Sequence, residues 1–151
     1  MGKKQLSSLE IEELLLAGEE GSLATVGPEG PYVVAVNYLY WREKIYFHGR
    51  KYGQKMKNIA ADKRVSFLVY KTNGYRRGLA PCATTALYQS VLVMGEAKVL
   101  EPELAAEVLS LLGRKYSPDL ADYAIPLEKL AITAVVEICP LKITGKAYEI
   151  S

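Results

Sequence analysis

The sequence predicts a mainly β fold, a small antiparallel barrel with added helices. Short segments of alternating apolar and polar residues recur along the chain, turn-forming Gly and Pro separate them, and only two long stretches have helical periodicity. Closure of such a sheet removes exposed strand edges. The 151 residues, 50% of them hydrophobic, form one expected domain, residues 1–151, large enough to build its own core.

The chain begins with an amphipathic helix, expected within residues 1–20. Leucines and glutamates mix over residues 7–17 at helical spacing. Ser7 and Glu10 fit a capping box, in which each side chain accepts a hydrogen bond from the other residue's backbone. Gly18 ends the predicted helix.

Three strands joined by short turns follow this helix. The alternation predicts them at residues 23–26, 32–40 and 44–48. Residues 27–31 are rich in Gly and Pro and supply the first turn, and residues 41–43 supply the second. Antiparallel hairpins are therefore the simplest connection.

The middle of the chain is predicted to contain a short helix, two strands and a long loop. Residues 53–61 suit the helix, and the first strand covers residues 64–70. Residues 71–83 have little periodicity and several turn formers, which predicts a loop long enough to be functional. The second strand, residues 84–100, is so long that we expect a bend at Gly95 or a place in two parts of a curved sheet.

A helix and a strand complete the predicted fold. Residues 101–116 are amphipathic and end before Pro118, and they form a helical insertion over residues 101–117 before the last strand. Residues 119–130 are expected to be irregular or briefly helical. Residues 132–138 alternate cleanly and read as the last strand.

Positive charge is concentrated in one segment. Residues 42–77 hold eleven Lys and Arg against two acidic residues, a local charge of +9 in a chain whose net charge is +2. The rest of the chain is therefore acidic, at −7. A localised basic segment indicates an anionic partner for that segment, although a solvated basic face gives the same pattern.

Several kinds of chemistry have no signal in the sequence. The single histidine, His48, and the distant Cys82 and Cys139 do not form a zinc-binding pattern or a disulfide scaffold. Neither a serine-hydrolase elbow nor a Gly-rich nucleotide loop is present. The sequence contains no stretch of apolar residues long enough to span a membrane and no secretory signal, so we expect a cytoplasmic protein with free thiols.

Residues 45–59 are the strongest candidate for a binding site. A strand is expected to end at His48, a basic turn containing glycines follows, and a helix begins near Gly53. Backbone N–H groups at a helix N-terminus and nearby cationic side chains suit a phosphate group. A basic turn that binds only water remains the alternative.

The chain resembles the FMN-binding split-barrel proteins related to pyridoxamine 5′-phosphate oxidase, in particular their nitroimidazole-resistance (Nim-type) branch. Three blocks in the same order carry the resemblance: residues 21–25 leading to 31–38; residues 45–49 with Gly53 and Lys55; and Cys82, Thr85, Tyr88, Ser90 and Val91. Residues 143–146 add a weaker match. Ala35 departs from the branch, which usually has proline there.

The resemblance implies a six-stranded split barrel that forms a homodimer, with one FMN in each of two clefts between the subunits. It implies the following cofactor-binding residues: Val34, Ala35, Val36, Asn37, Tyr38, His48, Gly49, Arg50, Lys55, Thr85, Tyr88 and Ser90. Lys55 is the first choice for the phosphate and Arg50 the second. Thr85 differs in strand parity from Tyr88 and Ser90, so an unbroken strand cannot turn all three to one side.

The resemblance further implies an FMN-dependent oxidoreductase that takes electrons from a reduced nicotinamide, NADH or NADPH, or from another donor. A nitro-aromatic compound is one candidate acceptor, whereas pyridoxamine phosphate is not expected because its full substrate signature is missing. His48 is the candidate catalytic residue, because imidazole can hydrogen-bond the cofactor or exchange a proton. Tyr75, Arg76 and Arg77 could cover the cleft and favour an acidic second substrate; a disordered loop in solvent is the alternative.

Three other functions stay open at this point. A flavin-binding module without turnover would act as a store or a redox sensor. A single-stranded nucleic-acid binder is less expected, although small basic barrels with aromatic surfaces can serve that role. Haem binding through His48 has the weakest support, a single histidine. No metal site is expected.

Overall fold

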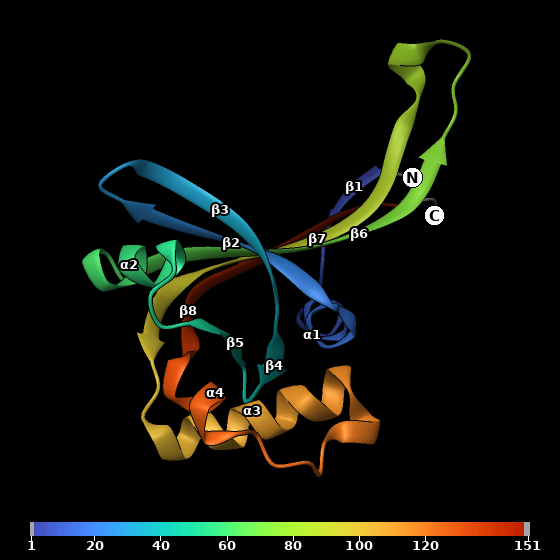
Figure 1. The fold of residues 1–151 in the computed structure, drawn as a ribbon. Helices are drawn as coiled ribbons and strands as arrows, with labels where there is room; N and C mark the ends of the chain where they lie inside the picture. The colour runs from blue at the N-terminus through green and yellow to red at the C-terminus, as the bar shows by residue number, and fades with distance from the viewer. Residues whose placement is uncertain (1, 150–151) are drawn as a thin grey trace.

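The protein folds around one antiparallel sheet, as the computed structural model of residues 2–149 shows (Figure 1). The strands run in the order β3-β2-β6-β7-β8-β5-β4, and β1 pairs with β8. Their bounds are β1 (Gly2–Gln5), β2 (Glu20–Gly27), β3 (Gly30–Asn37), β4 (Leu39–Trp41), β5 (Lys44–Arg50), β6 (Arg64–Arg76), β7 (Thr85–Val99) and β8 (Thr133–Glu149). The mainly β prediction is confirmed, but the described residues form eight strands rather than six.

Helices cover parts of the sheet. They are α1 (Ser8–Ala17), α2 (Gln54–Ala61), α3 (Pro102–Tyr116) and α4 (Leu127–Ile132), with short 3₁₀ turns η1 (Pro81–Ala83) and η2 (Pro118–Leu120). The predicted capping box is present, because the backbone N–H of Glu10 donates to Ser7 Oγ at 3.2 Å and that of Ser7 donates to Glu10 Oε1 at 3.2 Å. Among residues 2–149 no helix combines the length and apolar character that crossing a bilayer requires.

Two clusters of apolar side chains hold the elements together. The larger lies on the inner face of the sheet and includes the fully buried Leu23, Phe47 and Phe67. The smaller lies between α3 and the sheet, where Val108 packs with Val135. Each large side chain buried in this way contributes about 1.5 to 3 kcal/mol, so both clusters contribute substantially to stability.

Tyr38 divides the strand that the sequence predicts at residues 32–40. Its side chain is fully buried, and its hydroxyl donates to the carbonyl oxygen of Leu15 at 2.6 Å. Gly18 leaves room for this hydroxyl, since a Cβ there would lie 2.2 Å from it. The chain therefore leaves β3 at Tyr38 and enters the separate strand β4.

The prediction of a loop at residues 71–83 is wrong for the first half of this segment. Strand β6 continues to Arg76 and pairs with β7, with Tyr75 opposite Ala86. Asn73 and the positive-φ Gly74 lie in a register shift between Thr72 and Tyr75, which absorbs these turn formers without ending the strand. The two strands form a hairpin that extends well beyond the rest of the sheet (Figure 1). We call residues 71–89 the arm.

The long strand β7 changes register at the expected glycine. The pairing of β7 with β8 shifts between Met94 and Gly95, and a Cβ at Gly95 would lie 2.3 Å from the carbonyl oxygen of Cys139. Pro140, which cannot donate a ladder hydrogen bond, lies opposite this irregularity. The strand predicted at residues 132–138 is too short, because β8 continues past the proline to Glu149.

Candidate functional site

An open seam lies between β3 and the second half of β5. The short strand β4 pairs with β5 only from Lys44 to Tyr46, and β3 pairs with β2 alone among residues 2–149. Strands β3 and β5 lie beside each other without a described strand pairing. Backbone N–H and C=O groups on the free side of each strand can therefore bind a ligand. We call residues 34–37 and 47–50 the open seam.

A basic corner adjoins the open seam at the start of α2. Gly53 caps α2 without a side-chain hydrogen bond, and the first turn has no acidic residue. The Met56 N–H donates to the Gly53 carbonyl at 3.1 Å, which leaves the N–H groups of Gln54 and Lys55 for an anion. The Lys55 side chain lies over Gly49, where an added Cβ would be 2.9 Å from the ammonium nitrogen. The predicted pair Gly49 and Lys55 is thus brought together beside the helix N-terminus.

His48 lies within the electrostatic reach of this corner. Its side chain keeps an exposed edge, but neighbouring atoms desolvate the ring, which lowers the pKa of His48 below its usual value. The positive charge of Lys55 lowers it further. The imidazole is therefore neutral at neutral pH, and one ring nitrogen can accept a hydrogen bond while the other donates one.

The predicted residues of β3 alternate between the two faces of the sheet. Val34 and Val36 are half-buried and pack against the large core cluster, whereas Ala35 and Asn37 are exposed. Their side chains therefore differ in role, and only their backbone groups share the free edge of the strand. Arg50, at the end of β5, is exposed, so its side chain can approach a ligand at the corner.

Two residues of α3 that the sequence analysis did not single out hold the end of the open seam. The Tyr116 hydroxyl accepts from the Tyr38 backbone N–H at 3.0 Å and lies 2.9 Å from the Tyr38 carbonyl oxygen; the carbonyl of Glu19 also accepts from it. Burial raises the pKa of Tyr116, while hydrogen bonds to the Tyr38 backbone and Asn37 act against that rise. Lys115 also donates to Tyr38 O, at 2.8 Å. The only sequence signal for this contact was a basic residue in the last helical turn.

The predicted residues of β7 lie elsewhere. Tyr88 is on the arm, where its ring stacks on Tyr70 with 6.0 Å between centroids, and Thr85 lies near the arm's end. Figure 1 shows the arm pointing away from α2, so one chain does not bring these residues to Lys55. Ser90 is buried at the base of the arm. Strand β7 is continuous from Thr85, so the opposite parity of Thr85 remains.

The described residues provide no alternative centre for metal or disulfide chemistry. No group of three or more His, Cys, Asp or Glu side chains that could hold a metal occurs among residues 2–149. Cys82 and Cys139 are both free and exposed.

The chain is an antiparallel split barrel with added helices, and its open seam meets the basic N-terminus of α2. Residues 7–147 match the family model described as pyridoxamine 5′-phosphate oxidase, and the chain belongs to that family. The family resemblance noted in the sequence is thereby confirmed. No curated protein matches the sequence at a significant level.

Solved structures share the fold over nearly the whole chain. A candidate 5-nitroimidazole antibiotic resistance protein from Bacteroides thetaiotaomicron is 21% identical, with a TM-score of 0.79 over 99% of this chain and 93% of that chain. An FAD- and haem-binding protein from Mycobacterium smegmatis is 16% identical, with a TM-score of 0.88 over 99% of this chain and 75% of its own. An FAD-binding protein from Mesorhizobium loti is 23% identical, with a TM-score of 0.72 over 99% and 100%. At these identities the similarity establishes the fold.

Proposed function

We propose that this protein binds a flavin, FMN, at the open seam and acts as an oxidoreductase. The observation that carries the proposal is the position of Lys55 over Gly49, beside the N-terminus of α2, which has no side-chain cap. A cation and free N–H donors at one corner fit a phosphate, and each charge-assisted hydrogen bond contributes about 1.5 to 3 kcal/mol. Flavin-binding proteins among the solved structures of this fold support the same choice.

The other groups of the open seam fit the remainder of such a cofactor. The free edge of β3 offers alternating main-chain donors and acceptors, which suit the polar rim of an isoalloxazine ring. His48 is neutral and can hydrogen-bond the cofactor or a bound substrate. When bound, the flavin supplies the electron transfer, and these residues bind and orient it. The electron donor we propose is NADH or NADPH.

We further propose that the site is completed by a second copy of the chain. Thr85 and Tyr88 lie on the arm, away from Lys55 (Figure 1), so a homodimer is the arrangement that lets both groups reach one ligand. The outer face of the sheet has exposed apolar residues for such contact, including Leu68 and Met94. A hollow of about 510 Å³ with mostly apolar walls lies on this face beside Met94.

The acceptor we propose is a small molecule, with nitro-aromatic compounds as the first candidates. The Bacteroides thetaiotaomicron relative, described as a candidate nitroimidazole resistance protein, supports testing them first. We also expect the protein to work in the cytoplasm, because a reducing compartment keeps exposed cysteines such as Cys82 and Cys139 as thiols.

The first test is the identity of any bound flavin. The protein is purified without added cofactor, its visible spectrum is recorded, and the molecule released on denaturation is identified by mass. FMN is expected; released FAD would correct the cofactor, and a colourless protein that also fails to bind added FMN would overturn the proposal. Anaerobic titration with NADH and NADPH then tests turnover. If neither nucleotide reduces the bound flavin, the protein has a non-catalytic role.

A further inference from the structure

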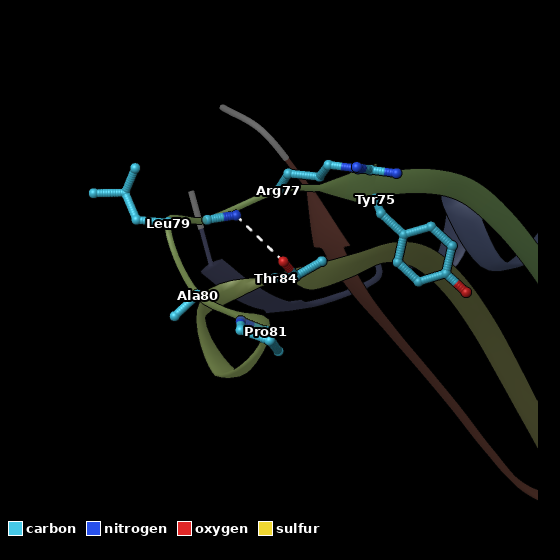
Figure 2. Close-up of a pocket in the computed structure, with 7 residues that line it drawn as sticks. Tyr75, Arg77, Leu79, Ala80, Pro81 and Thr84 are labelled. Atoms are coloured by element: carbon cyan, nitrogen blue, oxygen red, sulfur yellow. Dashed lines mark hydrogen bonds between the residues drawn. The ribbon is translucent and has the colours of Figure 1, made fainter.

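The tip of the arm carries a hollow of about 380 Å³, a volume within the range of small-molecule sites. Figure 2 shows the residues that surround it, which come from the end of β6 and the connection that leads to β7. The lining residues are Tyr75, Arg77, Gly78, Leu79, Ala80, Pro81 and Thr84. None of them belongs to the open seam.

The tip has a defined shape because hydrogen bonds close it. The Gly78 N–H donates to Thr84 Oγ1 at 3.3 Å, which joins the two sides of the turn (Figure 2). Inside the turn, the Thr84 N–H donates to the Pro81 carbonyl at 3.2 Å. A Cβ at Gly78 would lie 2.4 Å from the Cβ of Ala83, so the backbone there is closely packed. The hollow therefore belongs to a folded turn.

The charge of the tip suits an anion. Residues 75–84, which form the tip, contain no Asp or Glu and two cations, Arg76 and Arg77. Arg77 lines the hollow, and none of the ion pairs described among residues 2–149 involves it. Its planar guanidinium can donate two parallel hydrogen bonds to a carboxylate.

The other walls of the hollow suit a planar apolar body. Tyr75 lies near the end of β6 and Arg77 directly follows that strand, and both residues line the hollow. The Tyr75 ring is largely exposed and offers a surface for stacking, and Pro81 adds an apolar wall. Thr84 accepts from Gly78 and still has a hydroxyl proton to donate.

We propose that the arm tip binds the carboxylate of a small aromatic acid and thereby selects the second substrate. This inference rests on the proposed flavin function, because the arm also carries Thr85 and Tyr88, the residues we propose to reach the open seam of the second copy. Thr85 and Tyr88 follow Arg77 closely in the sequence, so a ligand that Arg77 binds would lie near them. In the proposed homodimer, the other subunit would cover the open side of the hollow.

The test compares benzoate with benzamide, which has the same ring and nearly the same shape but no charge. Binding of each to the protein as purified is measured by calorimetry for the wild type, Arg77→Gln and Arg114→Gln. Arg114 is an exposed arginine on α3, away from the arm, and serves as the matched control. Flavin content is recorded for every sample.

Benzoate is expected to bind the wild type at least tenfold more tightly than benzamide does. Arg77→Gln is expected to remove that preference while retaining the flavin, and Arg114→Gln is expected to keep it. Equal binding of the two probes to the wild type, or an unchanged preference in Arg77→Gln, would overturn the inference. Loss of flavin in Arg77→Gln with benzoate binding intact would also overturn it, by assigning Arg77 to the cofactor. If the wild type neither contains flavin nor binds added FMN, the proposed function fails, whereas the two probes still test the tip.

Discussion

The ammonium nitrogen of Lys115 lies 2.8 Å from the carbonyl oxygen of Tyr38 and 4.2 Å from the centre of the Tyr38 ring. The same ammonium donates to the carbonyl of Gly18 at 2.6 Å. Helix α3 is thereby tied both to the end of β3 and to the connection that leads from α1 into β2. This contact fixes the position at which the open seam ends.

Replacing Lys115 with Met is expected to lower the free energy of unfolding by about 2 kcal/mol, because hydrogen bonds from a charged donor contribute about 1.5 to 3 kcal/mol. Met keeps most of the apolar contact and removes the donor. Urea unfolding followed by circular dichroism measures the change. Arg114→Met, at the exposed neighbouring position, is the control and is expected to change stability by less than about 0.5 kcal/mol.

Alkaline pH is expected to destabilise the fold through its buried tyrosines. Burial raises the pKa of Tyr38 above its usual value near 10, and burial with a hydrogen bond to Glu137 raises that of Tyr46. Above pH 10 an unfolded tyrosine loses its proton while these two keep theirs, so stability is fully present below about pH 10 and falls as the pH rises.

Tyr38→Phe separates this effect from general alkaline unfolding. The variant is expected to lose about 1 to 3 kcal/mol at pH 7, because the Leu15 carbonyl loses the hydroxyl that donates to it. Its stability is then expected to fall less steeply between pH 10 and pH 11 than that of the wild type. Equal slopes in urea unfolding curves at these pH values would contradict the assignment to Tyr38.

The sequence was informative where local chemistry decides the structure. The capping box at Ser7 is confirmed, and the irregularity of β7 lies at Gly95, where the sequence predicted a bend, as a register shift. Each depends on neighbouring residues or on the absence of a side chain. The break at Tyr38 and the extension of β6 to Arg76 were not predicted. Each depends on a distant partner, the Leu15 carbonyl in one case and β7 in the other, which periodicity does not reveal.

Adding a single methyl group at Gly49 is expected to weaken flavin binding without unfolding the protein. The new Cβ of Gly49→Ala would lie 2.8 Å from Lys55 Cε, and this flexible side chain can move away at small cost. Its ammonium would then leave the corner where we place the phosphate. Fluorescence titration with FMN is expected to show at least a tenfold loss of affinity.

Gly113→Ala is the matched control for Gly49→Ala. It lies within α3, and the nearest atom to its added Cβ is 3.9 Å away. We expect unchanged FMN binding and a gain in stability of about 0.5 to 1 kcal/mol, because alanine is the better helix former. A similar loss of FMN affinity in both variants would contradict a specific role for Gly49.

The ammonium of Lys55 is expected to recognise the phosphate and not the ring. Lys55→Met should weaken FMN binding at least tenfold and leave binding of riboflavin, which has no phosphate, nearly unchanged. Lys57→Met changes an exposed lysine of the same helix and should affect neither ligand strongly. Equal losses for FMN and riboflavin in Lys55→Met would place this side chain away from the phosphate.

The sequence predicted which residue types form the candidate site, but it predicted only part of their arrangement in space. Gly49 and Lys55 are close in sequence, and the turn between β5 and α2 brings them together. Tyr116 contributes from α3, across 78 positions of sequence from Tyr38, so no local pattern could assign it to the open seam. Thr85 and Tyr88 were expected at the same site, but a single chain holds them on the arm.

A mixed dimer tests whether two copies share each site. If Lys55 of one subunit and Tyr88 of the other contact the same flavin, Lys55→Met and Tyr88→Ala should each bind FMN weakly as homodimers. In a heterodimer of the two variants, one site carries both substitutions and the other carries none. Purification through two different tags, followed by flavin quantification, is therefore expected to give one FMN per heterodimer. A site built within a single chain would leave both sites of the heterodimer damaged, and flavin binding would stay as weak as in the homodimers.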